Sequence, residues 1–286
     1  MRLRVGALTL SVTARHPTPY LVPPPTFAPF LVERGGDIRL ELTEEAAPVA
    51  DPRDLLFDSG AVWKVYRRPR GYLYTFETPV ADPPLYKAVD IDPALARGRL
   101  HFPRPRRGRR PRFAPAYPLD ELLFQHRFAR EGSAEVHALG VVLGGRAVLL
   151  CGQSGAGKST LARLFRRHAP AATVLSDDRI VLRPRATGVR AHGTPWHGDA
   201  AFAAPEARPL GSVFFLEQGE TRVGELTRPI AAARLFSRTF PPPWDAEAVP
   251  RVLALCARVA ETVPCYALRF RRDASAVAAI REAVRA

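Results

Sequence analysis

The feature that most constrains the fold of this chain is the segment Gly152-Gln153-Ser154-Gly155-Ala156-Gly157-Lys158-Ser159-Thr160. It satisfies the pattern G-x-x-x-x-G-K-[ST], whose meaning depends on its structural context. The context is present, because the apolar run 147–151 suits a buried strand and residues 161–165 carry the apolar stripe of a following helix. The sequence therefore predicts a strand, a glycine-rich turn and a helix that together cradle phosphates.

The glycines of this loop let the backbone curl so that successive N–H groups face the phosphates, and the helix N-terminus adds positive potential. Lys158 is expected to reach the β- and γ-phosphates, and the hydroxyl of Ser159 is expected to bind Mg²⁺. The ligand that fits best is ATP with Mg²⁺, held by Gly152, Ser154, Gly155, Ala156, Gly157, Lys158, Ser159 and Thr160. A glycine-rich turn without a ligand is the alternative.

Length and composition are those of a globular protein. The chain has 286 residues, of which 47% are apolar, enough for a large core in one domain or two. It has no run of about 18 apolar residues that could span a bilayer. Residues 1–15 alternate apolar and polar positions, unlike a secretory signal, so a cytoplasmic location without a membrane partner is the default expectation. Cys151, Cys256 and Cys265 lack metal-type spacing, which predicts reduced, buried thiols.

The net charge of +14 raises the question of a nucleic-acid partner, because clustered basic residues neutralise phosphates. Only Lys64, Lys87 and Lys158 are lysines, so the charge comes mainly from arginine, and this composition weakens the nucleic-acid interpretation. Six arginines lie in the Pro-interrupted stretch 104–112, without which the charge would fall from +14 to +8. We interpret this stretch as a solvated tether, with an electrostatic handle for RNA or an acidic partner as the alternative.

The first part of the chain carries mainly strand patterns separated by Pro and Gly clusters, at 3–12, 37–42, 61–66, 72–76 and 85–90. Residues 103–118 are rich in Pro and Arg and cannot hold a regular helix, since each proline removes a donor and fixes φ. The sequence therefore predicts a smaller β-rich N-terminal domain over 1–102, a linker over 103–118 and a second domain over 119–286.

The second domain alternates strands with helices. Strands are predicted at 135–143, 146–151, 173–176, 180–183 and 211–216. Helices are predicted at 120–130, 158–168, 229–239, 246–262 and 273–285, the last with Asp273 as its N-cap. This alternation indicates an α/β fold in which the strands of a central sheet are well buried.

Two adjacent carboxylates, Asp177 and Asp178, follow the predicted strand 173–176. A right-handed crossover through the helix would bring the end of this parallel strand to the phosphates. Because adjacent residues of an extended strand point in opposite directions, we expect one carboxylate to act as a base near an acceptor hydroxyl and the other to face the metal. A turn-forming pair of aspartates is the alternative.

His137 is placed by the hairpin signal Gly144-Gly145 between two apolar runs. In a two-residue hairpin at this point the paired residue numbers sum to 289, so that His137 pairs with Gly152 and lies beside the phosphate loop. We expect His137 to tune Asp177 or to contact a phosphate. A hydrogen-bonded structural histidine is the alternative.

Three segments together resemble the HPr kinase/phosphorylase family and its kinase relatives found with peptide natural-product clusters. They are Val136-His137-Ala138, the loop 152–160 and Val174-Leu175-Ser176-Asp177-Asp178-Arg179, and the resemblance covers about residues 120–217. It implies the P-loop kinase core shared with phosphoenolpyruvate carboxykinase, and transfer of the γ-phosphate of ATP to a serine or other hydroxyl of a peptide or small protein. Carried over, it implies that Asp177 is the base, that Asp178 lies near Mg²⁺ and that His137 supports Asp177.

The chain departs from this family at 189–198, where HPr kinases carry an Arg-Gly-Leu-Gly-Ile type segment that bears on phosphorylase activity. We therefore expect a kinase without the reverse reaction and with an acceptor other than HPr. The stretch 192–198 is similar to a Gly-Thr-Pro-Trp-x-Gly element of the peptide-tailoring relatives, where it would border the acceptor site. An ordinary loop with a buried Trp196 is the alternative, and Arg190 is a further candidate for contact with phosphate.

Other interpretations remain open from the sequence. An apolar strand that ends at Glu217 is a second candidate for the metal carboxylate. Nucleotide-gated binding without phosphoryl transfer would make the N-terminal domain an effector. Carboxykinase-like decarboxylation is weaker, because no second cluster of metal ligands is visible. The sequence does not decide the acceptor, the role of residues 1–102 or the formation of a homo-oligomer.

Overall fold

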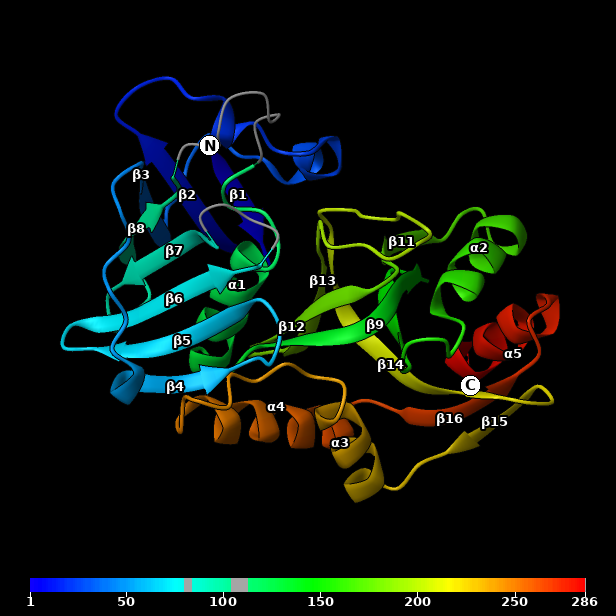
Figure 1. Ribbon diagram of the computed structural model, residues 1–286. Helices are drawn as coiled ribbons and strands as arrows, with labels where there is room; N and C mark the ends of the chain where they lie inside the picture. Colours follow the sequence, from blue (N-terminus) through cyan, green and yellow to red (C-terminus); the bar gives the residue numbers. More distant parts are fainter. Residues whose placement is uncertain (80–83, 104–112, 286) are drawn as a thin grey trace. The chain divides into compact units, whose positions relative to one another are not determined.

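The computed structural model describes residues 1–79, 84–103 and 113–285 (Figure 1). Within it the chain divides into two compact units, Met1–Phe124 and Gln125–Ala286, and helix α1 (Leu119–Arg130) contains the point of division. Most of the expected linker, including the arginines of 104–112, lies outside the described residues. Across the described ranges, no helix is both long enough and apolar enough to cross a membrane.

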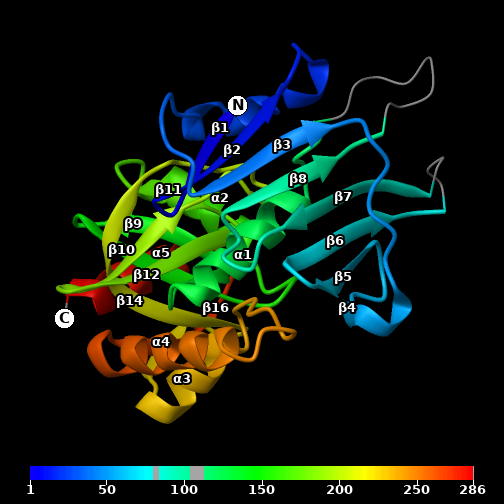
Figure 2. The same ribbon diagram turned by 90° about the vertical axis from the view of Figure 1, so that its left-hand side faces the viewer.

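The N-terminal unit is built on one mixed sheet, with eight strands among the residues described. The order is β1-β2-β3-β8-β7-β6-β5-β4, in which β2, β3 and β8 are parallel neighbours and the other pairs are antiparallel (Figure 2). The strands are β1 (Arg2–Val5), β2 (Leu8–Ala14), β3 (Ile38–Thr43), β4 (Leu55–Asp58), β5 (Trp63–Arg68), β6 (Gly71–Glu77), β7 (Leu85–Ile91) and β8 (Arg97–His101). Short 3-10 helices lie at Pro19–Leu21, Pro25–Phe30 and Pro52–Asp54.

This sheet corrects the sequence prediction at several strands. The strand expected at 3–12 is two strands, because Gly6 and Ala7 both adopt positive φ and turn the chain back on itself. The strands expected at 37–42, 61–66, 72–76 and 85–90 are confirmed as β3, β5, β6 and β7, whereas β4 and β8 are additional. β8 contains Gly98 between two arginines, a weak strand pattern, and it is stabilised by pairing on both edges with β3 and β7.

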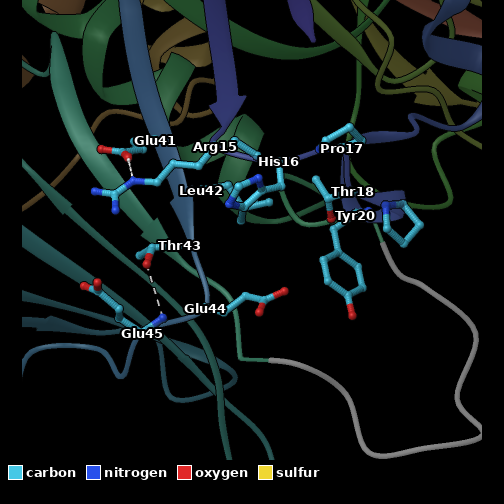
Figure 3. A pocket seen from close by; sticks show the side chains of 12 residues that line it. Arg15, His16, Pro17, Thr18, Tyr20, Glu41, Leu42, Thr43, Glu44 and Glu45 are labelled. Atoms are coloured by element: carbon cyan, nitrogen blue, oxygen red, sulfur yellow. Dashed lines mark hydrogen bonds and ion pairs between the residues drawn. The ribbon is translucent and has the colours of Figure 1, made fainter.

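The N-terminal unit has a concave site of its own. A cavity of about 430 Å³ opens where β2 and β3 end, and residues 14–20 and 41–45 line it (Figure 3). On one wall the guanidinium of Arg15 donates to Glu41 at 3.0 Å, and the ring of Tyr20 stands at the other side. The carboxyl ends of parallel strands meet at this edge, which is where open sheets often form hollows.

The C-terminal unit is an α/β structure around a second sheet, again with eight strands in the part of the chain that is described. The strands are β9 (Ala134–Leu143), β10 (Arg146–Cys151), β11 (Thr173–Ser176), β12 (Arg179–Arg185), β13 (Gly188–Gly193), β14 (Ala207–Gln218), β15 (Arg222–Glu225) and β16 (Cys265–Phe270). The helices are α2 (Lys158–His168), α3 (Arg228–Phe236), α4 (Ala248–Thr262) and α5 (Ala274–Arg285). Two long strands each pair with three others. β9 pairs with β10, β11 and β12, and β14 pairs with β10, β13 and β16.

Strand β10 lies at the centre and is buried on both faces. Val148 and Leu150 belong to an apolar layer with α2 and α5. Leu149 and Cys151 belong to a second layer with α3 and α4. A strand covered on both faces reads as a continuous apolar run, and β10 is the parallel neighbour of β14. The two layers therefore hold the end of β10, where the phosphate loop begins.

The predicted helices agree with α1 to α5 to within a few residues, while β13, β15 and β16 are additional strands. Asp273 caps α5 as predicted, because its carboxylate accepts the N–H of Ser275 at 2.9 Å. Cys151, Cys256 and Cys265 are free and buried, as expected.

Lys87 is a buried charge within the N-terminal unit. It is 3% exposed, and its Nζ donates to the carbonyl of Ala116 at 2.7 Å and lies 4.8 Å from the ring centroid of Phe76. Burial lowers the pKa of Lys87 to about 7, and the charge of Asp120 opposes this shift. The ammonium form therefore destabilises the folded unit at neutral pH.

Because the pKa of Lys87 lies below that of an unfolded lysine, the unfolded chain binds more protons than the folded chain between about pH 7 and pH 10. We expect the contribution of Lys87 to raise the free energy of unfolding across that window by at most about 1.4 kcal/mol per pH unit. Lys87→Met removes this rise, whereas Lys64→Met, at a partly exposed position, retains it. Urea denaturation followed by the ¹⁹F signal of fluorotryptophan at Trp63 measures the slope, and equal slopes in the two variants would contradict the assignment.

Candidate active site

The phosphate loop connects the end of β10 to the start of α2, and its glycines are required by backbone conformation and close packing. Gly155 and Gly157 adopt φ of 79° and 102°, a region that strains other residues. At Gly157 a Cβ atom would also lie 2.9 Å from the ring of Phe270. At Gly152 a Cβ atom would lie 2.7 Å from the Cβ of Ala156. The loop is therefore too tight for a side chain at Gly152 and Gly157, whereas Gly155 has space but a backbone conformation that favours glycine.

Several backbone N–H groups of the loop are left for a ligand. Those of Gly155, Gly157, Lys158 and Ser159 donate to no other residue that the structure describes. The last two begin α2, where the helix dipole adds positive potential. Such a set of converging donors fits an anion such as a phosphate group.

Lys158 is folded back over this loop. It is 7% exposed, and its Nζ donates to the carbonyls of Gly152 at 3.0 Å and Gln153 at 3.3 Å. Burial lowers the pKa of Lys158, and the negative charge of Asp178 opposes that shift. A phosphate beside Nζ would supply the negative charge that a buried ammonium requires.

Asp177 is buried, with 1% exposure, and both of its oxygens are engaged. Oδ1 accepts the backbone N–H groups of Gly198 at 3.0 Å and Phe202 at 3.3 Å, and Oδ2 accepts that of Ala200 at 2.9 Å. The hydroxyl of Ser159 donates to Oδ2 at 3.5 Å. Asp177 therefore anchors this segment against the start of α2.

Asp178 differs from its neighbour in exposure and in partners. Its side chain is 26% exposed, Oδ1 lies 2.9 Å from Nε2 of His137, and Oδ2 accepts from Arg179 at 2.5 Å. Burial would raise the pKa of Asp178, but the hydrogen bond from His137 and the charges of Arg179 and Lys158 outweigh it and leave the pKa below its ordinary value. Asp178 is therefore a carboxylate at neutral pH.

The position of His137 follows the prediction only in part. The register in which paired numbers sum to 289 is confirmed along β9 and β10. Beyond it β9 pairs with β12, so that His137 lies opposite Arg179 and not opposite Gly152. Its imidazole contacts Asp178, and the expectation that it supports Asp177 is therefore wrong. The reason is the turn after β11, which buries the first carboxylate and exposes the second.

The strand that precedes both carboxylates, β11, is parallel to β10 but is not its neighbour. β9 lies between them and is antiparallel to both. The parallel neighbour of β10 is β14, which ends near Glu217, the alternative metal carboxylate. Glu217 is instead paired with Arg234 at 2.9 Å and with Arg269 at 3.4 Å.

One cavity of about 430 Å³ collects the groups of the site, within the size range of small-ligand pockets. The residues that line it are His137, Ser154, Gly155, Gly157, Lys158, Ser159, Thr160, Arg163, Asp178, Gly198, Asp199 and Arg272. The structure thus brings the predicted phosphate loop together with Asp178 and His137. Arg163 and Arg272 belong to the site and were missed, because single arginines carry no signal in so arginine-rich a chain.

The segment 192–198 reaches this cavity at its last residue, Gly198. Trp196 is buried, with 8% exposure, as the ordinary-loop alternative requires, and its carbonyl accepts the hydroxyl of Ser176 at 2.9 Å. Arg190 lies on β13, donates to a backbone carbonyl of β14 and is not among the residues that line the cavity.

Within the described residues, no group of three His, Cys, Asp or Glu side chains could hold a metal ion. A metal at this site would therefore take most of its ligands from phosphate and water oxygens, with the hydroxyl of Ser159 as a protein ligand. Mg²⁺ is the ion that commonly binds in this way, since it keeps several waters and bridges substrate phosphates. The donor set fits Mg²⁺ in the company of a nucleotide.

No protein family model and no curated protein matches this sequence. Among solved structures, the chain is similar to the HPr(Ser) kinase/phosphatase from Coxiella burnetii, with 12% sequence identity and a TM-score of 0.32. The similarity covers 52% of this chain and 95% of that chain. Values this low do not assign the chain to a family.

Asp177→Asn leaves one acceptor oxygen for three backbone N–H groups, so that at least one loses its partner. We expect hydrogen exchange at Gly198, Ala200 or Phe202 to quicken about tenfold or more, since a hydrogen bond to a charged group contributes roughly 1.5–3 kcal/mol. Exchange measured by NMR tests this, with Asp199→Asn as the matched control. Unchanged exchange at all three positions would show that Asp177 does not anchor the segment.

Proposed function

We propose that this chain binds ATP with Mg²⁺ and transfers the γ-phosphate to a hydroxyl of a peptide or small protein. The observation that carries the proposal is an ionised carboxylate, Asp178, in the same cavity as the phosphate loop and Lys158. Phosphoryl transfer to a hydroxyl needs a group that accepts the hydroxyl proton. A loop that only held a nucleotide would not need one.

In this proposal the phosphates lie over the start of α2, bound by the N–H groups of the loop and by Lys158. Mg²⁺, held by Ser159, would neutralise charge on the phosphate oxygens when bound. We assign Asp177 to the side of the site where the metal would bind, because its Oδ2 lies 3.5 Å from the Ser159 hydroxyl. We assign Asp178 as the group that accepts the hydroxyl proton, because it lines the cavity. This reverses the division of roles that the family resemblance implies.

The proposed reaction is an in-line displacement. The oxygen of the acceptor hydroxyl forms a bond to the γ-phosphorus, the bond from phosphorus to the β–γ bridging oxygen breaks, and ADP leaves. The hydroxyl proton passes to Asp178, whose two oxygens are oriented by His137 and Arg179. Charge on the transferred phosphoryl group faces Lys158 and the loop N–H groups, which stabilise it without reorganisation.

A peptide or small-protein acceptor is proposed because the segment 192–198, which resembles an element of peptide-tailoring kinases, reaches the cavity at Gly198. Nucleotide-gated binding without transfer is the competing function. In that case Asp178 would only hold His137 and Arg179 in place.

The proposed binding of ATP is tested by calorimetry with Mg-ATP. Lys158→Ala removes the ammonium that faces the phosphates and is expected to raise the Kd for ATP about tenfold or more, because a hydrogen bond to a charged group is lost in a buried site. Lys64→Ala, which lies in the N-terminal unit, is the matched lysine control and keeps the affinity of the wild type. Equal affinity in both variants would refute phosphate binding at this loop.

The proposed transfer of phosphate is tested with candidate precursor peptides encoded beside the gene. They are incubated with Mg-ATP and the protein and then analysed by mass spectrometry. We expect the gain of one phosphate, with kcat lowered about a hundredfold or more in Asp178→Asn because the proton acceptor is lost. The Kd for ATP should change less than about threefold. Glu247→Gln, an exposed carboxylate paired with Arg251, should leave kcat unchanged. ATP binding with no transfer to any peptide would favour the nucleotide-gated switch.

A further inference from the structure

Phe240 lies beside both residues that hold Asp178, and no sequence motif singles it out. Its ring centroid is 6.2 Å from that of His137, and the guanidinium carbon of Arg179 lies 4.7 Å from the same ring. His137 and Arg179 in turn bind the two oxygens of Asp178, at 2.9 Å and 2.5 Å. One aromatic ring therefore adjoins both partners of a single carboxylate.

The backbone determines where this ring lies. Thr239 forms a β-bridge with Val136, and the N–H of His137 donates to the carbonyl of Arg238 at 2.8 Å. The chain that leaves α3 is therefore paired along the first half of β9, next to His137. Phe240 is the next residue after Thr239. Its position is therefore determined by hydrogen bonds of the backbone.

The chemistry of the contact favours an orienting role. A guanidinium over an aromatic face is attracted by the ring quadrupole, and the flat ring also limits the rotation of a neighbouring imidazole. Arg179 is held from a second direction by Glu135, whose side chain is fully buried, at 3.2 Å. With the ring on one side and a carboxylate on the other, the guanidinium has little freedom to leave Asp178.

We propose that Phe240 is a positioning residue. It holds His137 and Arg179 in the orientation in which both bind Asp178, and it thereby keeps that carboxylate directed at the acceptor hydroxyl. The effect on transfer rests on the proposed function, whereas the effect on the hydrogen bond between His137 and Asp178 does not. Phe240 acts through these two residues and is not among the residues that line the cavity.

The geometric part is tested on the full chain by ¹⁵N NMR of the imidazole groups, with His137→Gln to assign the signals of His137. Phe240→Leu is expected to move the Nε2 signal of His137 toward that of a solvent-exposed imidazole, while Phe240→Tyr retains the ring and the signal. Phe236→Leu, in the preceding helix, is the matched control. An unchanged His137 signal in Phe240→Leu would overturn the proposal.

The kinetic part uses the phosphotransfer assay. Phe240→Leu is expected to lower kcat about tenfold and to leave KM for ATP within about twofold, because small displacements of a reacting group lower the rate without loss of binding. Phe240→Tyr restores kcat. A raised KM with unchanged kcat would show that Phe240 contributes to binding and would overturn the positioning role. If the wild-type chain transfers no phosphate, the proposed function fails and the NMR result alone decides the role of Phe240.

Discussion

The buried carboxylate of Asp177 is the group on which the rest of the site depends. A carboxylate removed from water must find hydrogen-bond donors, and Asp177 takes three of them from the backbone of 198–202. These bonds draw that segment over the start of α2. The bend between β11 and β12 that buries Asp177 leaves Asp178 in the lining of the cavity.

The carboxylate of Asp178 is then held by residues from two further strands. His137 comes from β9 and Arg179 from the start of β12, and these two strands pair antiparallel at this point. Because His137 pairs with Arg179, the residue that follows Asp178 in the chain, both side chains can reach the same carboxylate. The aromatic ring of Phe240, which follows α3 in the chain, lies beside both His137 and Arg179.

The sequence patterns predicted correctly those elements that depend on residues close together in the chain. The apolar run of β10, the helix stripe of α2 and the capping carboxylate of Asp273 were all found where they were expected. The missed strands depend on their neighbours. β16 (Cys265–Phe270) is short and contains an exposed arginine, Arg269, but it is stabilised between β14 and β15 by long-range pairing that no local pattern shows.

The sequence by itself determined the phosphate loop and its strand and helix, because glycine, lysine and apolar periodicity act within a few residues of one another. It also determined that two aspartates follow the next strand toward that loop. Only the tertiary structure decided which aspartate is buried and which one His137 contacts, since this depends on the backbone of 198–202, far along the chain. Long-range strand pairing also places Arg272, which follows β16, and Phe240, which follows the bridge between Thr239 and Val136, whereas Arg163 lies on α2 directly after the loop.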